Sequence, residues 1–212
     1  RHLQALSATD NILNISVLDA SKSSLDTAKE RFNAINDGFK GQVSYTTQLD
    51  AIPKELDVVI IATSSNPRAK IIHNLLEHAK VSFLVLEKFL FPRLSEYQEI
   101  ANLFEKNDVK VWVNCPRRMQ KTYHFVKEMI NTEEKLQVNV NANGFGLGCN
   151  GIHFIDLFAF LCGESKVQWE TSLLDPEILS SKRDGYLEFS GTLKGDAKGH
   201  TITMTSYKEG VS

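Results

Sequence analysis

Two side chains with acid/base chemistry stand at positions where an open α/β sheet could use them. Lys88 follows the apolar run 84–86, which is typical of a strand covered on both faces. A lysine at the carboxyl end of a central parallel strand points into the crevice where such sheets bind ligands. His153 precedes Asp156 by three residues, so a helix would place both on one face. We predict that Lys88 and His153 transfer protons.

Plain structural explanations compete with this chemistry. A solvated strand end accounts equally well for Lys88 and its neighbour Glu87, and is the more common situation. His153 equally fits a hydrogen-bonded core histidine that Asp156 orients. Metal binding is not expected, because His153 and Asp156 would need a third ligand. His73 and His78, five residues apart, lack the spacing of the usual zinc motifs.

Segments typical of strands and helices alternate over the first half of the chain. β-Branched and apolar runs predict the strands, and periodic apolar positions after Ser or Asn-Pro predict the helices. The expected strands are 14–19, 42–47, 56–63, 81–88 and 109–114, and the expected helices are 1–6, 21–35, 66–80 and 94–107. This alternation predicts an α/β fold with a Rossmann-type doubly wound parallel sheet.

The pattern changes after a predicted helix at 115–132. A helix at 151–163, closed by Gly163, is followed almost entirely by strand-like segments with Gly-containing turns. We predict a first domain at 1–116 and a second at 117–212, an α+β domain with an open, mostly antiparallel sheet. The chain opens in the middle of a helix, so the first strand and glycine loop of the first domain are expected to be missing, and the second domain to be incomplete.

Composition narrows the classes of function. The 212 residues carry 24 Lys and Arg against 26 Asp and Glu, without a basic stripe, so nucleic acid is not an expected partner. The longest apolar runs fall short of the ~20 residues that span a bilayer, so no membrane partner is expected. The three cysteines, Cys115, Cys149 and Cys162, match no zinc or disulfide framework. Reduced thiols favour a cytoplasmic location.

Two places could mark a dinucleotide site. Asp19 ends the first strand, where an acid accepts hydrogen bonds from an adenosine ribose, although a helix cap explains it too. Gly146, Gly148 and Gly151 form a literal G-x-G-x-x-G, with Glu170 at the spacing of the ribose acid. A dinucleotide site needs further βαβ units downstream, and none follows this motif. We interpret these three glycines as a turn that lets backbone approach a ligand.

Six segments together resemble the Gfo/Idh/MocA oxidoreductases, named for glucose-fructose oxidoreductase and inositol dehydrogenase. In order they are RHLQAL, VLDASKSSLDTAKERF, DVVIIATSSNPRAKIIHNLLEH, LEKFLF (similar to an E-K-P motif), VNCPRRM and GIHFIDLFAFLCG (similar to an H-x-x-D helix). They span residues 1–163 in the family's order. The resemblance implies a Rossmann domain that binds NAD or NADP, hydride transfer at a sugar or cyclitol carbon, and a second domain whose sheet mediates homo-oligomerisation.

The same resemblance assigns roles by position. Lys88 would bind and deprotonate the reacting hydroxyl, and His153 would be the acid/base histidine. The cofactor-binding residues would be Asp19 at the ribose and Ala62, Thr63, Asn66 and Glu87 at the nicotinamide. Ser21 and Lys22 could accept a 2′-phosphate, so NAD and NADP both stay open. Arg117, Arg118 and Tyr123 are candidates for substrate contacts, with a solvated helix face as the alternative. VWVNCPRRM resembles a subgroup of the family found with surface-sugar biosynthesis, which hints at a nucleotide-sugar or amino-sugar substrate.

Three positions depart from the family's pattern. Phe89 replaces the proline after the lysine, Ser64 replaces a proline after AT, and Cys149 replaces an acid four residues before the histidine. Phe89 and Cys149 favour an alternative function, a non-catalytic NAD(P)-binding sensor or scaffold. A methyltransferase on a similar sheet is a third alternative, which the helix with His153 gives no reason to expect.

Overall fold

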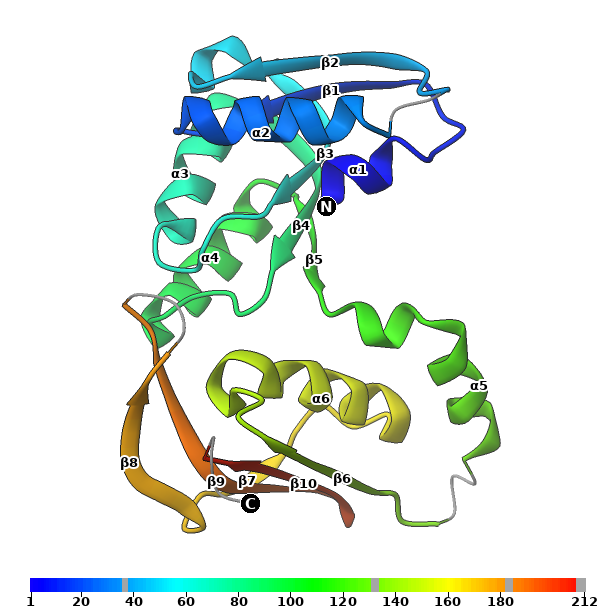
Figure 1. The fold of residues 1–212 in the computed structure, drawn as a ribbon, viewed down its shortest axis with the longest axis vertical. Helices are drawn as coiled ribbons and strands as arrows, with labels where there is room; N and C mark the ends of the chain where they lie inside the picture. The colour runs from blue at the N-terminus through cyan, green and yellow to red at the C-terminus, as the bar shows by residue number, and fades with distance from the viewer. Residues whose placement is uncertain (36–37, 131–133, 182–184, 209–212) are drawn as a thin grey trace. The chain divides into compact units, whose positions relative to one another are not determined.

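The computed structural model describes residues 1–35, 38–130, 134–181 and 185–208. The chain divides into two compact units, Arg1–Val113 (unit 1) and Asn114–Ser212 (unit 2). Each unit has its own hydrophobic core. The helices and strands of both units are labelled in Figure 1.

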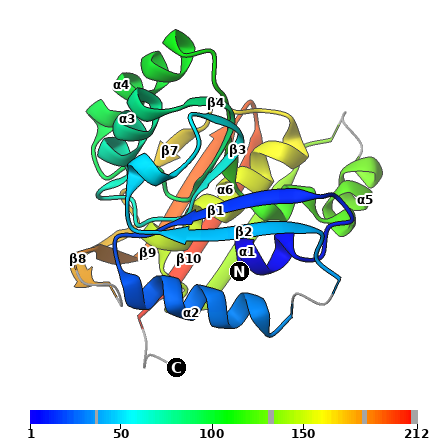
Figure 2. The same cartoon turned by 90° about the horizontal axis from the view of Figure 1, so that it is seen from above.

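Unit 1 alternates helices with mostly parallel strands, which confirms the α/β class. Its elements are α1 (His2–Leu6), β1 (Leu13–Leu18), α2 (Lys22–Asn33), β2 (Gly41–Thr46), a 3₁₀ turn (Leu49–Ala51), β3 (Glu55–Ile61), α3 (Arg68–His78), β4 (Lys80–Glu87), α4 (Leu94–Lys106) and β5 (Lys110–Asn114). β1 pairs with β2 in parallel, and β3 pairs with β4 in parallel. α2 runs alongside the β1–β2 pair (Figure 2).

The described strands of unit 1 divide between two sheets, β1–β2 and β3–β4–β5. In a doubly wound sheet of strand order 3-2-1-4-5, one strand separates those that correspond here to β1 and β3. No strand of the described residues takes that place. The parallel pairing is therefore as predicted, and the described strands do not form one continuous sheet.

Helices α3 and α4 cover one face of the β3–β4–β5 sheet. Ile72 of α3, Leu84 of β4 and Ile100 of α4 are fully buried in the core that results. The opposite face presents Phe83, 37% exposed, and Trp112, 52% exposed, with their rings 5.7 Å apart. The apolar side chains on both faces of these strands predict two covered faces, but among the described residues of unit 1 helices cover only one.

Unit 2 packs one long helix on a mixed sheet. Its elements are a 3₁₀ turn (Pro116–Met119), α5 (Lys121–Met129), β6 (Gln137–Asn143), α6 (Leu147–Cys162), β7 (Gln168–Glu170), β8 (Leu174–Ser180), β9 (Leu187–Ala197) and β10 (His200–Tyr207). The strand order is β6-β10-β9-β7, with β8 also paired to β9. β6 and β10 are parallel and the other described pairs are antiparallel.

Two predicted helices of unit 2 are wrong in their bounds. The helix predicted at 115–132 is broken at Gln120, whose ψ of 132° is extended, so a 3₁₀ turn precedes α5; residues 131 and 132 lie outside the described residues. The helix predicted at 151–163 starts earlier, at Leu147. Gly146, with a φ of 74°, reverses the chain before it, so Gly148 and Gly151 lie inside a helix and not in a turn.

Among the described residues, no helix is both long enough and apolar enough to cross a bilayer.

Candidate functional site

The loops after β3 and β4 start on the same side of their sheet, where the carboxyl ends of these parallel strands lie; this side is called the carboxyl edge below. Ile61 pairs with Leu86, and these residues stand at or next to the carboxyl ends of the two parallel strands. Ala62 and Thr63 therefore follow β3 beside the point where Lys88 follows β4. The side chain of Lys88 is half-buried, and Ala62 and Thr63 are exposed. This edge has the geometry that ligand-binding α/β sheets use.

A buried arginine ties these two loops together. Arg68, the first residue of α3, is 1% exposed. Its Nη1 donates to the carbonyl oxygens of Glu87 (2.8 Å), Phe89 (2.6 Å) and Leu90 (2.8 Å), and its Nη2 donates to that of Thr63. Arg68 is not among the site residues predicted from the sequence. A signal was present, because a cation in the first turn of a helix opposes the helix dipole and needs another reason to be there.

Other predicted cofactor residues border the same edge. The Glu87 carboxylate lies 2.7 Å from Nε2 of His2, which connects β4 to α1. Asn66 is exposed in the turn that leads into α3. The peptide bond between Lys88 and Phe89 is cis. The structure thus brings Thr63, which follows β3, close to Glu87 at the end of β4 and to Lys88 directly after it.

Asp19 lies directly after β1 and is exposed. Its Oδ1 accepts a hydrogen bond from the backbone N–H of Ser21 at 2.8 Å, and Ser21 in turn caps α2 through Ser24. The N-cap of α2 is therefore Ser21, and Asp19 binds only the N–H of this cap residue in the turn before the helix. An exposed carboxylate at this strand end also fits a ribose hydroxyl group, because one oxygen can serve the turn while the other accepts from a ligand.

In unit 2, α6 carries His153 and Asp156 one turn apart, and both are half-buried. Arg118 donates to the Asp156 carboxylate through Nε at 2.8 Å and also through Nη2. These hydrogen bonds raise the pKa of Arg118 above its usual range, with burial opposing them. Asp156 thus pairs with Arg118 of the 3₁₀ turn Pro116–Met119. The sequence had suggested Arg118 as a substrate contact, and this ion pair within unit 2 was not predicted.

The other two candidate substrate residues also contact their own unit. The Arg117 guanidinium lies 4.4 Å from the centre of the Phe154 ring, in cation–π geometry. Its Nη1 lies 3.4 Å from the hydroxyl oxygen of Tyr123. Arg117 and Tyr123 are thereby linked to α6 next to His153. The structure brings Arg117, Arg118, Tyr123 and His153 into one region of unit 2.

The G-x-G-x-x-G of unit 2 holds a carboxylate of the chain itself. The N–H groups of Gly148 and Cys149 donate to Glu188 of β9 at 2.8 and 2.9 Å. A Cβ on Gly146 would lie 2.9 Å from this carboxylate and one on Gly148 3.1 Å from it. The glycines therefore make room for Glu188. Glu170, the acid at the ribose spacing, accepts from the N–H of Ser172 at 2.7 Å in a local turn.

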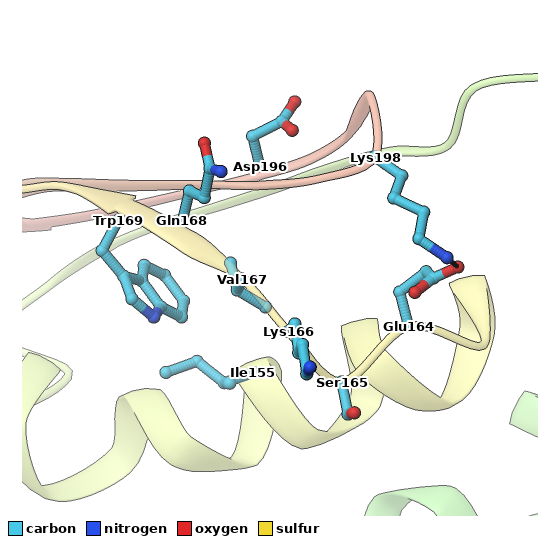
Figure 3. Close-up of a pocket in the computed structure, with 9 residues that line it drawn as sticks. All are labelled: Ile155, Glu164, Ser165, Lys166, Val167, Gln168, Trp169, Asp196 and Lys198. Atoms are coloured by element: carbon cyan, nitrogen blue, oxygen red, sulfur yellow. Dashed lines mark hydrogen bonds and ion pairs between the residues drawn. The ribbon is translucent and has the colours of Figure 1, made fainter.

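A hollow of about 900 Å³ in unit 2 is separate from the predicted site residues. It is bordered by residues near the end of α6, on β7 and around the β9–β10 turn (Figure 3). Trp169 and Val167 point toward α6, whereas Gln168 and Asp196 point to the other face of the sheet (Figure 3). Since these side chains diverge, they form no convergent set for one ligand. The described residues also contain no cluster of His, Cys, Asp and Glu that could hold a metal ion.

Parallel strands, alternating helices and polar residues at the carboxyl strand ends define unit 1 as a Rossmann-type α/β unit. The model of the Gfo/Idh/MocA oxidoreductase family, described as having an NAD-binding Rossmann fold, matches residues 1–115. This chain belongs to that family.

Solved structures share the fold over nearly the whole chain at low sequence identity. An NAD-binding protein from Listeria innocua is 17% identical with a TM-score of 0.71, over 100% of this chain and 64% of its own. Myo-inositol 2-dehydrogenase from Lactobacillus plantarum is 15% identical with a TM-score of 0.68, over 98% of this chain and 66% of its own. A super-repressor mutant of Gal80p from Saccharomyces cerevisiae is 12% identical with a TM-score of 0.70, over 100% and 64%.

The chain thus spans 64 to 66% of the length of these three proteins. Among curated proteins, no sequence matches it.

Proposed function

We propose that the protein is an NAD(P)-dependent oxidoreductase that moves a hydride between the nicotinamide and a secondary alcohol or ketone of a sugar, nucleotide sugar or cyclitol. Membership of an oxidoreductase family with an NAD-binding Rossmann fold supports the reaction class. The substrate class rests on the resemblance of the sequence, and on a structural neighbour that is a myo-inositol dehydrogenase. We further propose that the protein acts in the cytoplasm as a homo-oligomer assembled through the sheet of unit 2.

The observation that carries this proposal is the placing of Lys88 at the carboxyl edge of two paired parallel strands. Lys88 stands beyond Leu84 and Leu86, the residues of β4 that lie in the core of the sheet. Its ammonium group is therefore at a position from which a side chain can reach a ligand in the crevice beyond the strand ends. The neighbouring loop with Ala62, Thr63 and Asn66 has the position from which a Rossmann unit contacts its cofactor.

The chemistry divides between the cofactor and the side chains. A bound nicotinamide supplies or accepts the hydride. Lys88 takes the proton from the substrate hydroxyl group on oxidation and returns it on reduction, and His153 acts as the second acid/base group. Asp19 accepts from the adenosine ribose, while Glu87, Ala62, Thr63 and Asn66 contact the nicotinamide side. Ser21 and Lys22 follow Asp19, so a 2′-phosphate is also compatible.

The remaining assignments concern orientation. Arg118, paired with Asp156, holds the 3₁₀ turn of unit 2 against α6 and thereby fixes the helix that presents His153. Arg117 and Tyr123 contact the substrate from the same region. A substrate with a phosphate or diphosphate group would suit Arg117, since guanidinium groups bind such groups in bidentate fashion.

Substitution of Lys88 by Met tests the proposal in the full-length protein. Met keeps most of the length and volume of the side chain but cannot exchange a proton. We expect turnover to fall by about 100- to 10,000-fold, the usual contribution of a positioned acid/base group, with much less change in the affinity for NADH or NADPH. Turnover is measured with a panel of cyclitols, sugars and nucleotide sugars, and cofactor affinity by fluorescence titration. Normal turnover in both Lys88→Met and His153→Ala contradicts the assignment.

A non-catalytic NAD(P)-binding protein is the second candidate. Cys149 favours it, because the resembled family has an acid at this place, one turn before the histidine. The N–H of Cys149 is already bound to Glu188, and its Sγ lies 3.8 Å from the Ser181 hydroxyl oxygen. Binding of NADH or NADPH without turnover of any substrate in the panel would select this function over the first.

A further inference from the structure

Arg68 carries a charge in the interior of unit 1 and needs a reason to be there. The residue is 1% exposed, and a guanidinium group taken out of water is stable only when its donors are hydrogen-bonded. Arg68 also begins α3, where the unpaired N–H groups of the first turn make the environment positive. Two unfavourable effects therefore act on one cation, and its hydrogen bonds to backbone carbonyl oxygens offset them.

The carbonyl oxygens that Arg68 binds bracket Lys88. Nη1 donates to Glu87 on one side of Lys88 and to Phe89 on the other, and Leu90 adds a third acceptor. Fixing the peptide groups on both sides of a residue fixes the direction of its Cα–Cβ bond. Nη2 donates to the carbonyl oxygen of Thr63, so the same guanidinium group also sets the distance between this loop and the loop after β3.

Only arginine has the donors for this arrangement. Its guanidinium group is planar and presents five N–H donors in a rigid fork, whereas a lysine presents three donors on one nitrogen. Phe89 has no ring that fixes its φ, unlike the proline of the E-K-P motif that the sequence resembles. The conformation of residues 87–90 therefore depends on contacts from outside the segment. Arg68 supplies three hydrogen bonds to this segment and a fourth to Thr63.

We propose that Arg68 is the positioning residue for Lys88: by binding the carbonyl oxygens of Thr63, Glu87, Phe89 and Leu90, it holds the lysine at the geometry that proton transfer needs. This role rests on the function proposed for Lys88. A displacement of a reacting group by about 1 Å costs on the order of 100-fold in rate. Loss of the fork should therefore act on turnover far more than on cofactor affinity.

The test compares Arg68→Lys with Arg31→Lys in the full-length protein. Both keep the positive charge, and Arg31 is exposed near the end of α2, so its substitution serves as the matched control. Three quantities are measured: the urea unfolding transition, kcat and KM across pH, and the rate at which an amine reagent labels Lys88, with Lys54 as the internal reference. The labelling needs neither substrate nor turnover.

We expect Arg68→Lys to unfold cooperatively, to lose about 100-fold in kcat with a smaller change in KM for the cofactor, and to label faster at Lys88 while Lys54 labels as before. Arg31→Lys should behave as the wild type. Wild-type turnover, or a wild-type labelling rate at Lys88, in Arg68→Lys overturns the proposal.

Two further outcomes are also decisive. If the wild-type protein itself turns over no substrate, the proposed function fails, and the labelling rate alone decides whether Arg68 positions Lys88. If Arg68→Lys does not fold, backbone NMR order parameters of the wild type decide. Values near about 0.85 for residues 87–90, as in rigid backbone, sustain the proposal, and values below about 0.6 overturn it.

Discussion

Helix α3 in unit 1 and helix α6 in unit 2 both begin where a charged side chain binds backbone, but the two charges are opposite. At the start of α6, the Glu188 carboxylate accepts from the N–H groups of Gly148 and Cys149. A negative charge there complements both the unpaired donors and the helix dipole. At the start of α3, the Arg68 guanidinium donates to carbonyl oxygens of loops outside the helix, against the dipole. The stability of the helix start is therefore enough to explain the position of Glu188, but it does not explain the position of Arg68.

The difference shows that a sequence motif has to be judged by the contacts that its residues make in the fold. The G-x-G-x-x-G of unit 2 matches a dinucleotide fingerprint by spacing, yet its helix start is filled by the chain's own carboxylate. A side chain on Gly146 would come within 2.9 Å of that carboxylate, so a structural requirement accounts for the glycine. Arg68 matches no motif, yet it joins the two loops that carry the predicted cofactor and catalytic residues. The buried charge of Arg68 therefore supports the proposed site, whereas the glycine motif does not.

The largest effect expected from this comparison is on the stability of unit 1. Arg68→Met keeps an apolar side chain of similar length but leaves the carbonyl oxygens of Thr63, Glu87, Phe89 and Leu90 without this donor. A hydrogen bond to a charged group contributes about 1.5 to 3 kcal/mol, so we expect a loss of about 3 kcal/mol in the free energy of unfolding. Urea unfolding followed by circular dichroism measures it, and Arg31→Met is the exposed control. A loss below about 1 kcal/mol would mean that the carbonyl oxygens find water or other donors.

The next effect separates the two candidate ribose acids. Asp19→Ala should weaken NADH binding by about tenfold, because a hydrogen bond to a charged acceptor is worth about 1.5 kcal/mol or more, whereas Glu170→Ala should leave it unchanged. Fluorescence titration of the full-length protein measures both. The reverse ranking would show that the glycine motif of unit 2 is the cofactor site after all.

A smaller effect is expected at the start of α6. Glu188→Ala removes the acceptor of two N–H groups at the first turn, and helix caps contribute about 1 kcal/mol. Glu177→Ala is the control, because the Glu177 side chain is 61% exposed and its partner is the surface residue Lys208. Thermal or urea unfolding should show a loss for the first variant and almost none for the second. Equal losses would show that Glu188 contributes no more than a surface ion pair.

Much of the fold could be predicted from local patterns. The β-branched run before Ala62 and the Ser cap at Ser21 are local signals, and they predict β3 and α2 closely. The start of α6 could not be predicted, because Glu188, which lies some forty residues downstream, binds its first turn. The break at Gln120 was missed for a related reason, since its neighbours favour a helix and the extended backbone there depends on tertiary context.

The candidate site was also predictable only where local sequence carries the signal. Lys88 follows an apolar strand, and its charge makes it visible in the sequence. The charge of Arg68 in the first turn of a helix is a weak signal in the sequence, and its role stays hidden because its four acceptors come from segments that only the fold brings together. The pairing of Arg118 with Asp156, 38 residues apart, is likewise a product of tertiary structure.

The smallest expected effect concerns a buried hydroxyl group for which the described residues provide no hydrogen-bond partner. The Tyr45 hydroxyl group on β2 is buried without a hydrogen bond to the described residues. Tyr45→Phe should therefore leave unit 1 as stable or stabilise it by up to about 1 kcal/mol at pH 7. Burial also raises the pKa of Tyr45 above its ordinary value near 10. The unfolded chain then ionises first, so the stability of the wild type falls as the pH rises from about 10 through the higher folded pKa.

Tyr45→Phe removes that titration, so its advantage over the wild type should be constant below pH 10 and grow above it. Urea unfolding at pH 7 and at about pH 10.5 measures both parts. Ser44→Ala, on the same strand, is the control, since Ser44 is exposed and does not titrate in this range. A loss of stability in Tyr45→Phe at pH 7 would show that an ordered water or another group bonds the hydroxyl.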